Sequence, residues 1–148
     1  MKRMHIHVGV TDIEQSVRFY STLFAAEPAV LQADYAKWML DDPRVNFAIS
    51  SDGHARTGID HIGIQAENAG EQSEVFERLQ AADGPKLEEG ETTCCYAKSE
   101  KSWIADPDGV VWETFLTTGQ STVYGGSPAL ETLVSGSSGN CCVPKGVS

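Results

Sequence analysis

The sequence contains an internal repeat, in which a strand and a helix start recur at one fixed spacing. His5 and His61 lie 56 residues apart, and so do Asp12 and Asn68. The stretches MHIHVGV and IDHIGIQA, which carry the two histidines, alternate polar and apolar side chains as half-buried strands do. Asp12 and Asn68 are each followed three residues later by Gln or Glu, a pattern typical of a helix N-terminus. The shared offset predicts two copies of one strand–helix–strands unit.

The remaining segments of each copy fit the same unit. One helix should follow each first strand, over 13–26 and over 73–82. Three short strands should then follow each helix, at 29–33, 36–40 and 45–50 in the first copy and at 92–98, 101–106 and 110–116 in the second. The Asp-Pro-Asp-Gly run at 106–109 predicts a tight turn before the last of them.

Length and composition are those of one packed α+β domain. The chain has 148 residues, of which 41% are hydrophobic and 22% charged, close to the globular average. We expect this domain over 1–117, with modules at about 3–52 and 59–117. The composition then changes to a Gly- and Ser-rich tail over 118–148.

Charge and hydropathy exclude several classes of partner. The formal net charge is -10, and the basic residues form no cluster that could neutralise successive phosphates, so nucleic acid is not an expected partner. No apolar run resembles a signal peptide or reaches the ~20 residues of a membrane span. We therefore expect a cytoplasmic protein with no membrane partner, in which the four cysteines stay reduced.

Three side chains suited to a metal stand at corresponding places in the repeat. His5 and His61 belong to the first strand of each copy, and Glu113 belongs to the last strand of the second. If the two copies curl into one cleft, these residues can point inward together. Two imidazoles and one carboxylate leave coordination positions open, as in Fe(II) oxygenases. His7 shares a strand face with His5, but residue 63, its counterpart, is a glycine. We therefore assign His5 as the ligand and His7 as a residue that orients a ligand or supports the structure.

These residues also carry a resemblance to a known superfamily. The stretches HIHVGVTDIEQSVRFYSTLF, DHIGIQAENAGE and DPDGVVWETF resemble the vicinal oxygen chelate superfamily, which includes glyoxalase I, bleomycin-resistance proteins and extradiol dioxygenases, over about residues 3–117. The resemblance implies two βαβββ modules that form a curved mixed sheet, a cup around a divalent metal. It also implies that His5, His61 and Glu113 are the metal ligands. The fourth ligand position of glyoxalase I would fall near 46–48, where no carboxylate or histidine stands, so the three-ligand branch fits better.

A pair of adjacent thiols, Cys94 and Cys95, needs a separate explanation. A disulfide between neighbours is strained and easily reduced. Two soft thiolates could instead chelate one thiophilic atom such as trivalent arsenic. Successive side chains of a regular strand point to opposite faces, so chelation requires a bulge or loop at this pair.

With the modules assigned, the stretch CCYAKSEKSWIADPDGVVWETF resembles the organoarsenical carbon-arsenic lyases, some of which are called cadmium-induced proteins. The resemblance implies that Cys94 and Cys95 hold a trivalent organoarsenical, such as methylarsenite or an aromatic arsenical, beside Fe(II). It also implies that O2 is the co-substrate and that arsenite is released, a detoxification reaction. Tyr96 and Lys101 could polarise the thiols or line the pocket, although a packed aromatic residue and a solvated lysine explain them as well.

Two other functions remain open on the sequence. An extradiol-type dioxygenase would use the metal site but would leave the thiol pair unexplained. A cadmium- or arsenic-binding protein without catalysis would use the thiols and leave the metal site unexplained. The second adjacent pair, Cys141 and Cys142, could capture arsenic for the inner pair or could be incidental to a tail. The chain could act as a monomer or as a homodimer.

Overall fold

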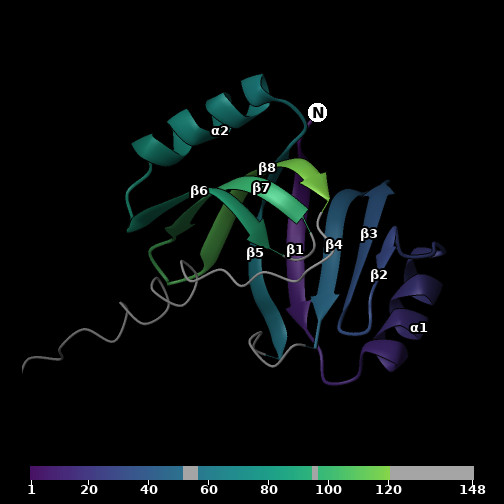
Figure 1. Ribbon diagram of the computed structural model, residues 1–148. Coiled ribbons are helices and arrows are strands. Elements are labelled where there is room, and N and C mark those ends of the chain that lie inside the picture. The colour runs from purple at the N-terminus through teal and green to yellow at the C-terminus, as the bar shows by residue number, and fades with distance from the viewer. Residues whose placement is uncertain (52–56, 95–96, 121–148) are drawn as a thin grey trace, which may run out of the picture.

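A computed structural model describes residues 1–51, 57–94 and 97–120, and within these it describes only the backbone of 89–94, 97–99 and 118–120. Two helices and eight strands follow one another along the chain as a βαβββ unit and a second βαβββ unit. The strands form a single curved sheet, and the helices lie apart from each other beside its two halves (Figure 1). The expected fold class is therefore confirmed.

The elements of the first unit begin at β1 and end at β4. They are β1 (Arg3–Gly9), α1 (Ile13–Phe24), β2 (Val30–Leu31), β3 (Tyr35–Asp41) and β4 (Arg44–Ser50). Helix α1 starts because the Asp12 side chain accepts a hydrogen bond from the Gln15 backbone N–H, which a helix start leaves without a partner. It ends at Ala25, whose φ of 50° lies in the left-handed region and stops the helix.

The second unit repeats this order. Its elements are β5 (Gly58–Ala66), α2 (Ala69–Ala81), β6 (Lys86–Cys94), β7 (Ala97–Ala105) and β8 (Val111–Gln120). Asn68 caps α2 by accepting from the Glu71 backbone N–H, as Asp12 does for α1. The turn predicted at 106–109 is present, because the Gly109 N–H donates to the Asp106 carbonyl at 3.0 Å.

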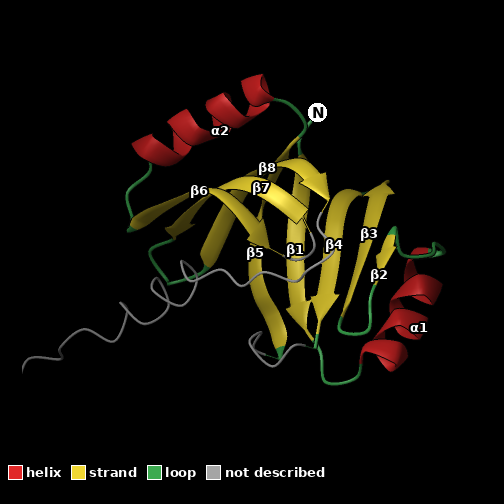
Figure 2. Cartoon of the chain, in the orientation of Figure 1, coloured by secondary structure: helices red, strands yellow, loops and turns green. Residues whose placement is uncertain are grey.

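The order of the strands shows how the two units combine. Across the sheet it is β2-β3-β4-β1-β5-β8-β7-β6, so the first strands of the two units meet in the middle and the later strands lie outward in matching order. The central pair β1–β5 is antiparallel, whereas β1–β4 and β5–β8 are parallel. Figure 2 shows this sheet with one helix beside each half. The candidate ligands of both units are therefore carried to the centre of one sheet.

Apolar packing fixes the helices to the outer face of the sheet. Trp38 and Phe47, both buried, pack with Tyr20 and Phe24 of α1, with the Phe24 and Phe47 ring centroids 5.1 Å apart. Helix α2 buries apolar side chains at two positions and contacts β5 and β8. Each fully buried aliphatic or aromatic side chain of this kind contributes roughly 1.5–3 kcal/mol. The helices hold one face of the sheet, and the polar residues of β1, β4 and β5 are buried on the other.

One predicted strand is wrong. The segment 92–98 is not a single strand, because β6 ends at Cys94, β7 begins at Ala97, and these two residues pair with each other in an antiparallel ladder. The chain therefore reverses direction between Cys94 and Ala97.

The boundary expected at residue 117 stays a prediction, since β8 continues to Gln120 and most of the tail lies outside the described residues. Neither helix of the described chain has the length and apolar character needed to cross a membrane.

Candidate metal centre

The central strands bring the three sequence-predicted ligands together. His5 on β1 is paired with Gly63 on β5, and Gly63 is paired with Glu113 on β8. His61 precedes Gly63 by two residues and so lies on the same face of β5. A side chain at position 63 would clash with the neighbouring strand, because a Cβ there would lie 2.2 Å from the Glu113 carbonyl oxygen. All three candidate ligands are buried, with Glu113 only 2% exposed.

We refer to His5, His61 and Glu113 as the convergent triad. The two Nε2 atoms of the histidines are 3.3 Å apart, and each lies 3.5 Å from Oε2 of Glu113. Donor atoms about 2.1 Å from one divalent ion lie roughly 3.0–3.4 Å apart when the angle at the ion is about 90–109°. The three separations match that spacing, so the triad fits a divalent ion without rearrangement.

Each histidine of the triad is oriented by its second ring nitrogen. His5 Nδ1 donates to the Asn46 backbone carbonyl at 3.1 Å, and His61 Nδ1 donates to the Asp60 carboxylate at 2.8 Å. Metal-binding histidines almost always donate this second N–H to a carbonyl or carboxylate, which fixes the tautomer and leaves the other nitrogen for the metal. The neighbours of the triad therefore favour ligation through both Nε2 atoms.

The protonation states are set by burial and by the neighbouring charges. Burial lowers the pKa of His5 to about 4 despite the nearby Glu113 carboxylate. Burial also opposes protonation of His61, but its hydrogen bonds to Asp60 and Glu113 outweigh it and raise the pKa to about 9. Burial acts to raise the pKa of Glu113, yet the Lys101 charge and the His61 hydrogen bond hold it well below its usual value. Without a bound ion, the triad is thus expected to contain a carboxylate and a protonated His61 at neutral pH.

Lys101 lies inside the site, although the sequence placed it only beside the thiols. Its Nζ donates to Oε1 of Glu113, the oxygen that does not face the histidines. The ammonium group also lies 5.6 Å from the Trp103 ring and 5.7 Å from the Phe115 ring, within cation–π range. Lys101 thereby holds the Glu113 carboxylate with one oxygen directed at the histidines.

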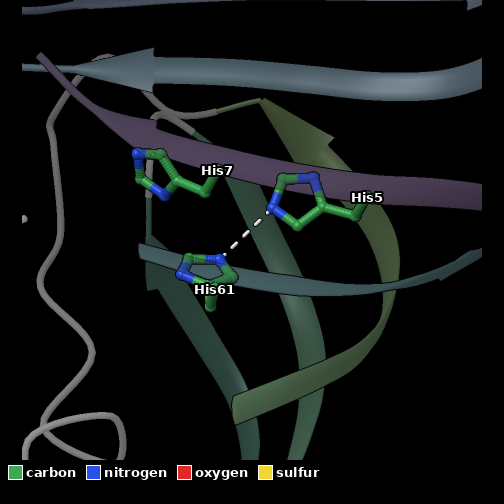
Figure 3. Close-up of side chains that lie close together, drawn as sticks. All are labelled: His5, His7 and His61. Atoms are coloured by element: carbon green, nitrogen blue, oxygen red, sulfur yellow. Dashed lines mark hydrogen bonds between the residues drawn. The ribbon is translucent and has the colours of Figure 1, made fainter. Parts of the chain in front are cut away.

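His7 joins the same cluster. It is 3% exposed, its ring centroid lies 4.8 Å from that of His61, and its Nε2 is 2.9 Å from the Ser50 hydroxyl. One nitrogen from each of His5, His7 and His61 lies within 4.8 Å of the other two. Figure 3 shows the three rings gathered on adjacent strands, with a nitrogen of His7 turned toward His61. Spacing alone could not choose between His5 and His7, and the structure places both at the site.

The predicted substrate-binding cysteines lie outside the part of the chain whose side chains are described. Cys94 is the last residue of β6, but its side chain lies outside the described atoms, and Cys95 and Tyr96 lie outside the described residues. The tail pair Cys141 and Cys142 also lies outside them. The described backbone ends β6 at Cys94 and begins β7 at Ala97, and these two residues pair in an antiparallel ladder.

The sequence reasoning missed two residues that orient imidazoles. Asp60 immediately precedes His61 and accepts its Nδ1 hydrogen, and Ser50 holds His7. The Asp-His pair was a signal, since a carboxylate next to a candidate ligand can orient it. Ser50, which ends a strand 43 residues from His7, gave no comparable signal.

Comparisons with known proteins give one family match and several named relatives. Residues 2–114 match the family described as the Glyoxalase/Bleomycin resistance protein/Dioxygenase superfamily. The chain is 43% identical over 120 residues to the trivalent organoarsenical cleaving enzyme of Bacillus sp. (strain MD1), covering 79% of this chain and 74% of that protein. It is 29% identical over 142 residues to the cadmium-induced protein CadI of Mycobacterium tuberculosis (strain ATCC 25618 / H37Rv), covering 96% and 93%.

A solved structure shows the same fold at low identity. The Mn(II)-bound glyoxalase from Novosphingobium aromaticivorans superposes with a TM-score of 0.55 at 18% identity, covering 86% of this chain and 44% of that one. At this identity the likeness supports the shared fold and says nothing of a shared reaction.

Proposed function

The chain belongs to the glyoxalase/bleomycin resistance protein/dioxygenase superfamily, and we propose that it is an Fe(II)-dependent dioxygenase that cleaves the carbon-arsenic bond of trivalent organoarsenicals. The observation that carries this proposal is the convergent triad, whose three donor atoms lie 3.3–3.5 Å from one another in a buried site. The relative named as a trivalent organoarsenical cleaving enzyme supports the choice of substrate.

The metal would be held by Nε2 of His5, Nε2 of His61 and Oε2 of Glu113. Two imidazoles and one carboxylate are a donor set that suits Fe(II) and leaves positions open for other molecules. Fe(II) held there would supply the centre at which O2 becomes reactive. The protein fixes this site through Asp60, the Asn46 carbonyl and Lys101, each of which orients one member of the triad.

The buried environment would protect the reaction from water. The Trp103 ring lies edge-on to His61, with centroids 5.2 Å apart, and the Phe115 ring lies edge-on to His5 at 5.1 Å. These rings exclude solvent from the triad on the sides where they pack. Exclusion of water strengthens every charge interaction in the site.

Cys94 and Cys95 would bind the substrate as thiolates. Trivalent arsenic is thiophilic, and two neighbouring sulfur atoms could hold it while its carbon substituent stays exposed to the metal centre. Such capture would turn a collision between molecules into a step within one complex. The reversal between β6 and β7 at this pair is consistent with two thiols at one bend. Tyr96 could line this pocket, and Cys141 and Cys142 could capture arsenic before the inner pair.

The test is single-turnover chemistry with a defined substrate. The protein is loaded with Fe(II) without oxygen, mixed with methylarsenite and then exposed to air, and inorganic arsenite is measured by chromatography with mass detection. We expect arsenite from the loaded protein and none from the metal-free protein. A Cys95→Ser variant should lose turnover even at saturating substrate while it keeps its metal. A Cys142→Ser variant, measured at the same saturating substrate so that capture by the tail pair does not limit turnover, provides the matched thiol control.

A binding protein without catalysis is the second candidate, because one relative is named for induction by cadmium. That function predicts stoichiometric retention of arsenic and no arsenite. It also predicts that a His61→Ala variant retains arsenic as well as the unmodified protein does. An extradiol-type dioxygenase would instead open a catechol ring with the Fe(II)-loaded protein and would not depend on Cys95.

A further inference from the structure

The internal repeat shows which residue of the first unit corresponds to Glu113, the candidate carboxylate ligand of the second unit. In the second unit, Gly63 on β5 pairs with Glu113 on β8. The equivalent pair of the first unit, 56 residues earlier on β1, is His7 with Ala48 on β4. Ala48 is therefore the counterpart of Glu113, and His7 is the counterpart of Gly63. The first unit therefore has a methyl side chain where the second has a carboxylate, and it has an imidazole on the paired residue where the second has a glycine.

His7 is held in the orientation that metal-binding histidines adopt. Its Nε2 lies 2.9 Å from the Ser50 hydroxyl, which is fully buried. The three imidazoles of the cluster thus each have one nitrogen bonded to an oxygen: a backbone carbonyl for His5, a carboxylate for His61 and a hydroxyl for His7. A second N–H donated in this way leaves the remaining nitrogen as the metal donor. For His7 that nitrogen is Nδ1.

The distances allow His7 to reach the ion that the triad would hold. The cluster nitrogens lie within 4.8 Å of one another. Two donors on opposite sides of an ion, each about 2.1 Å from it, lie about 4.2 Å apart. The cluster separations exceed this value by about 0.6 Å or less, so a small movement of the His7 ring would suffice for ligation. Figure 3 shows one nitrogen of His7 facing His61.

We propose that His7 is a fourth protein ligand of the metal through Nδ1, so that the set is three imidazoles and one carboxylate. This inference rests on the proposed metal centre and deepens it. A fourth protein ligand leaves fewer positions for other molecules. A catechol that binds through two oxygens would compete with O2 for those positions, whereas an arsenical held by thiolates needs none. The added ligand therefore selects substrates that are anchored away from the metal.

The test counts imidazoles on a bound ion. Mn(II) is added to the full chain without oxygen, and pulsed electron paramagnetic resonance measures the number of nitrogen ligands. We expect three imidazoles in the unmodified protein and two in a His7→Phe variant, which keeps an aromatic ring and removes the donor. The Mn(II) affinity of that variant should fall by about tenfold or more.

Controls separate this inference from the metal centre itself. A Ser50→Ala variant keeps His7 but frees its ring, so the Mn(II) affinity should fall by less than in His7→Phe. Two imidazoles in the unmodified protein, with unchanged affinity in His7→Phe, would overturn the role of His7 alone. Unchanged Mn(II) binding in His61→Ala would overturn the proposed centre. If circular dichroism shows that His7→Phe does not fold, the number of imidazole ligands on Mn(II) in the unmodified protein decides whether His7 is a ligand.

Discussion

Binding of a divalent ion should displace one proton from His61. Without a bound ion, hydrogen bonds to Asp60 and Glu113 outweigh the effect of burial and raise the pKa of His61 to about 9. The other candidate donors have no proton to lose at pH 7, since the pKa of His5 is about 4 and those of His7 and Glu113 lie well below their usual values. A raised pKa favours the protonated imidazole, and the metal needs the neutral one. Binding should therefore strengthen as the pH rises.

The size of this effect follows from the pKa. At pH 7 a group with a pKa of about 9 is unprotonated about one time in a hundred, which weakens binding by about 3 kcal/mol. The Mn(II) affinity should rise about tenfold per pH unit from 7 and become constant above about 9. About one proton should be released per ion bound at pH 7.

The assay follows free Mn(II) by its electron paramagnetic resonance signal without oxygen, in parallel with proton release measured by an indicator dye in weak buffer. Mn(II) is chosen because it has little affinity for thiolates, so the cysteines do not contribute. An Asp60→Asn variant removes the carboxylate that accepts the His61 hydrogen bond, so its affinity profile should shift to lower pH and it should release less than one proton at pH 7. Asp12→Asn, which keeps a helix cap far from the site, is the matched control. An affinity that stays flat from pH 7 to 9, with no proton released, would refute the assigned protonation states.

Two further predictions concern residues that support the triad. Lys101→Met leaves the Glu113 carboxylate buried without its cation and should destabilise the metal-free protein by about 3–5 kcal/mol in urea unfolding, with part of the loss restored by saturating Mn(II). Lys2→Met, which removes an exposed ion pair, should cost less than about 1 kcal/mol. Gly63→Ala places a methyl group 2.2 Å from the Glu113 carbonyl oxygen and should cost about 3 kcal/mol or more, as well as weakening Mn(II) binding. Gly70→Ala in α2 meets nothing closer than 3.3 Å and should be close to neutral, so equal unfolding free energies for the two glycine variants would contradict the steric reason given for Gly63.

The repeat made much of the architecture predictable from the sequence. The 56-residue offset between His5 and His61 predicts two equivalent strands. In the structure these two strands, β1 and β5, pair with each other at the centre of the sheet. The helix caps were predictable for a local reason, because Asp12 and Asn68 satisfy N–H groups only three residues away. Local hydrogen bonds and the alternation of polar and apolar residues depend only on residues that are close together in the sequence, so they can be predicted from it.

Contacts between distant strands were harder to predict. Lys101 lies in a stretch of alternating charged residues that is typical of a solvated strand, and only the pairing of β7 with β8 reveals its bond to Glu113. The reversal after Cys94 was missed because Cys-Cys-Tyr-Ala contains none of the Gly, Pro, Asn or Asp residues that mark turns. The place of His7 depends on the parallel register of β1 with β4, which a single sequence does not specify.

Charge balance explains how so many ionisable groups can be buried in one site. Without a bound ion, the site contains two acidic side chains, Asp60 and Glu113, and two basic ones, Lys101 and a protonated His61, so the charges cancel. Replacement of one proton by a divalent ion gives the same groups a net charge of one positive unit. A buried net charge is costly unless an opposite charge accompanies it. The loaded site should therefore attract anions more strongly than the metal-free site does.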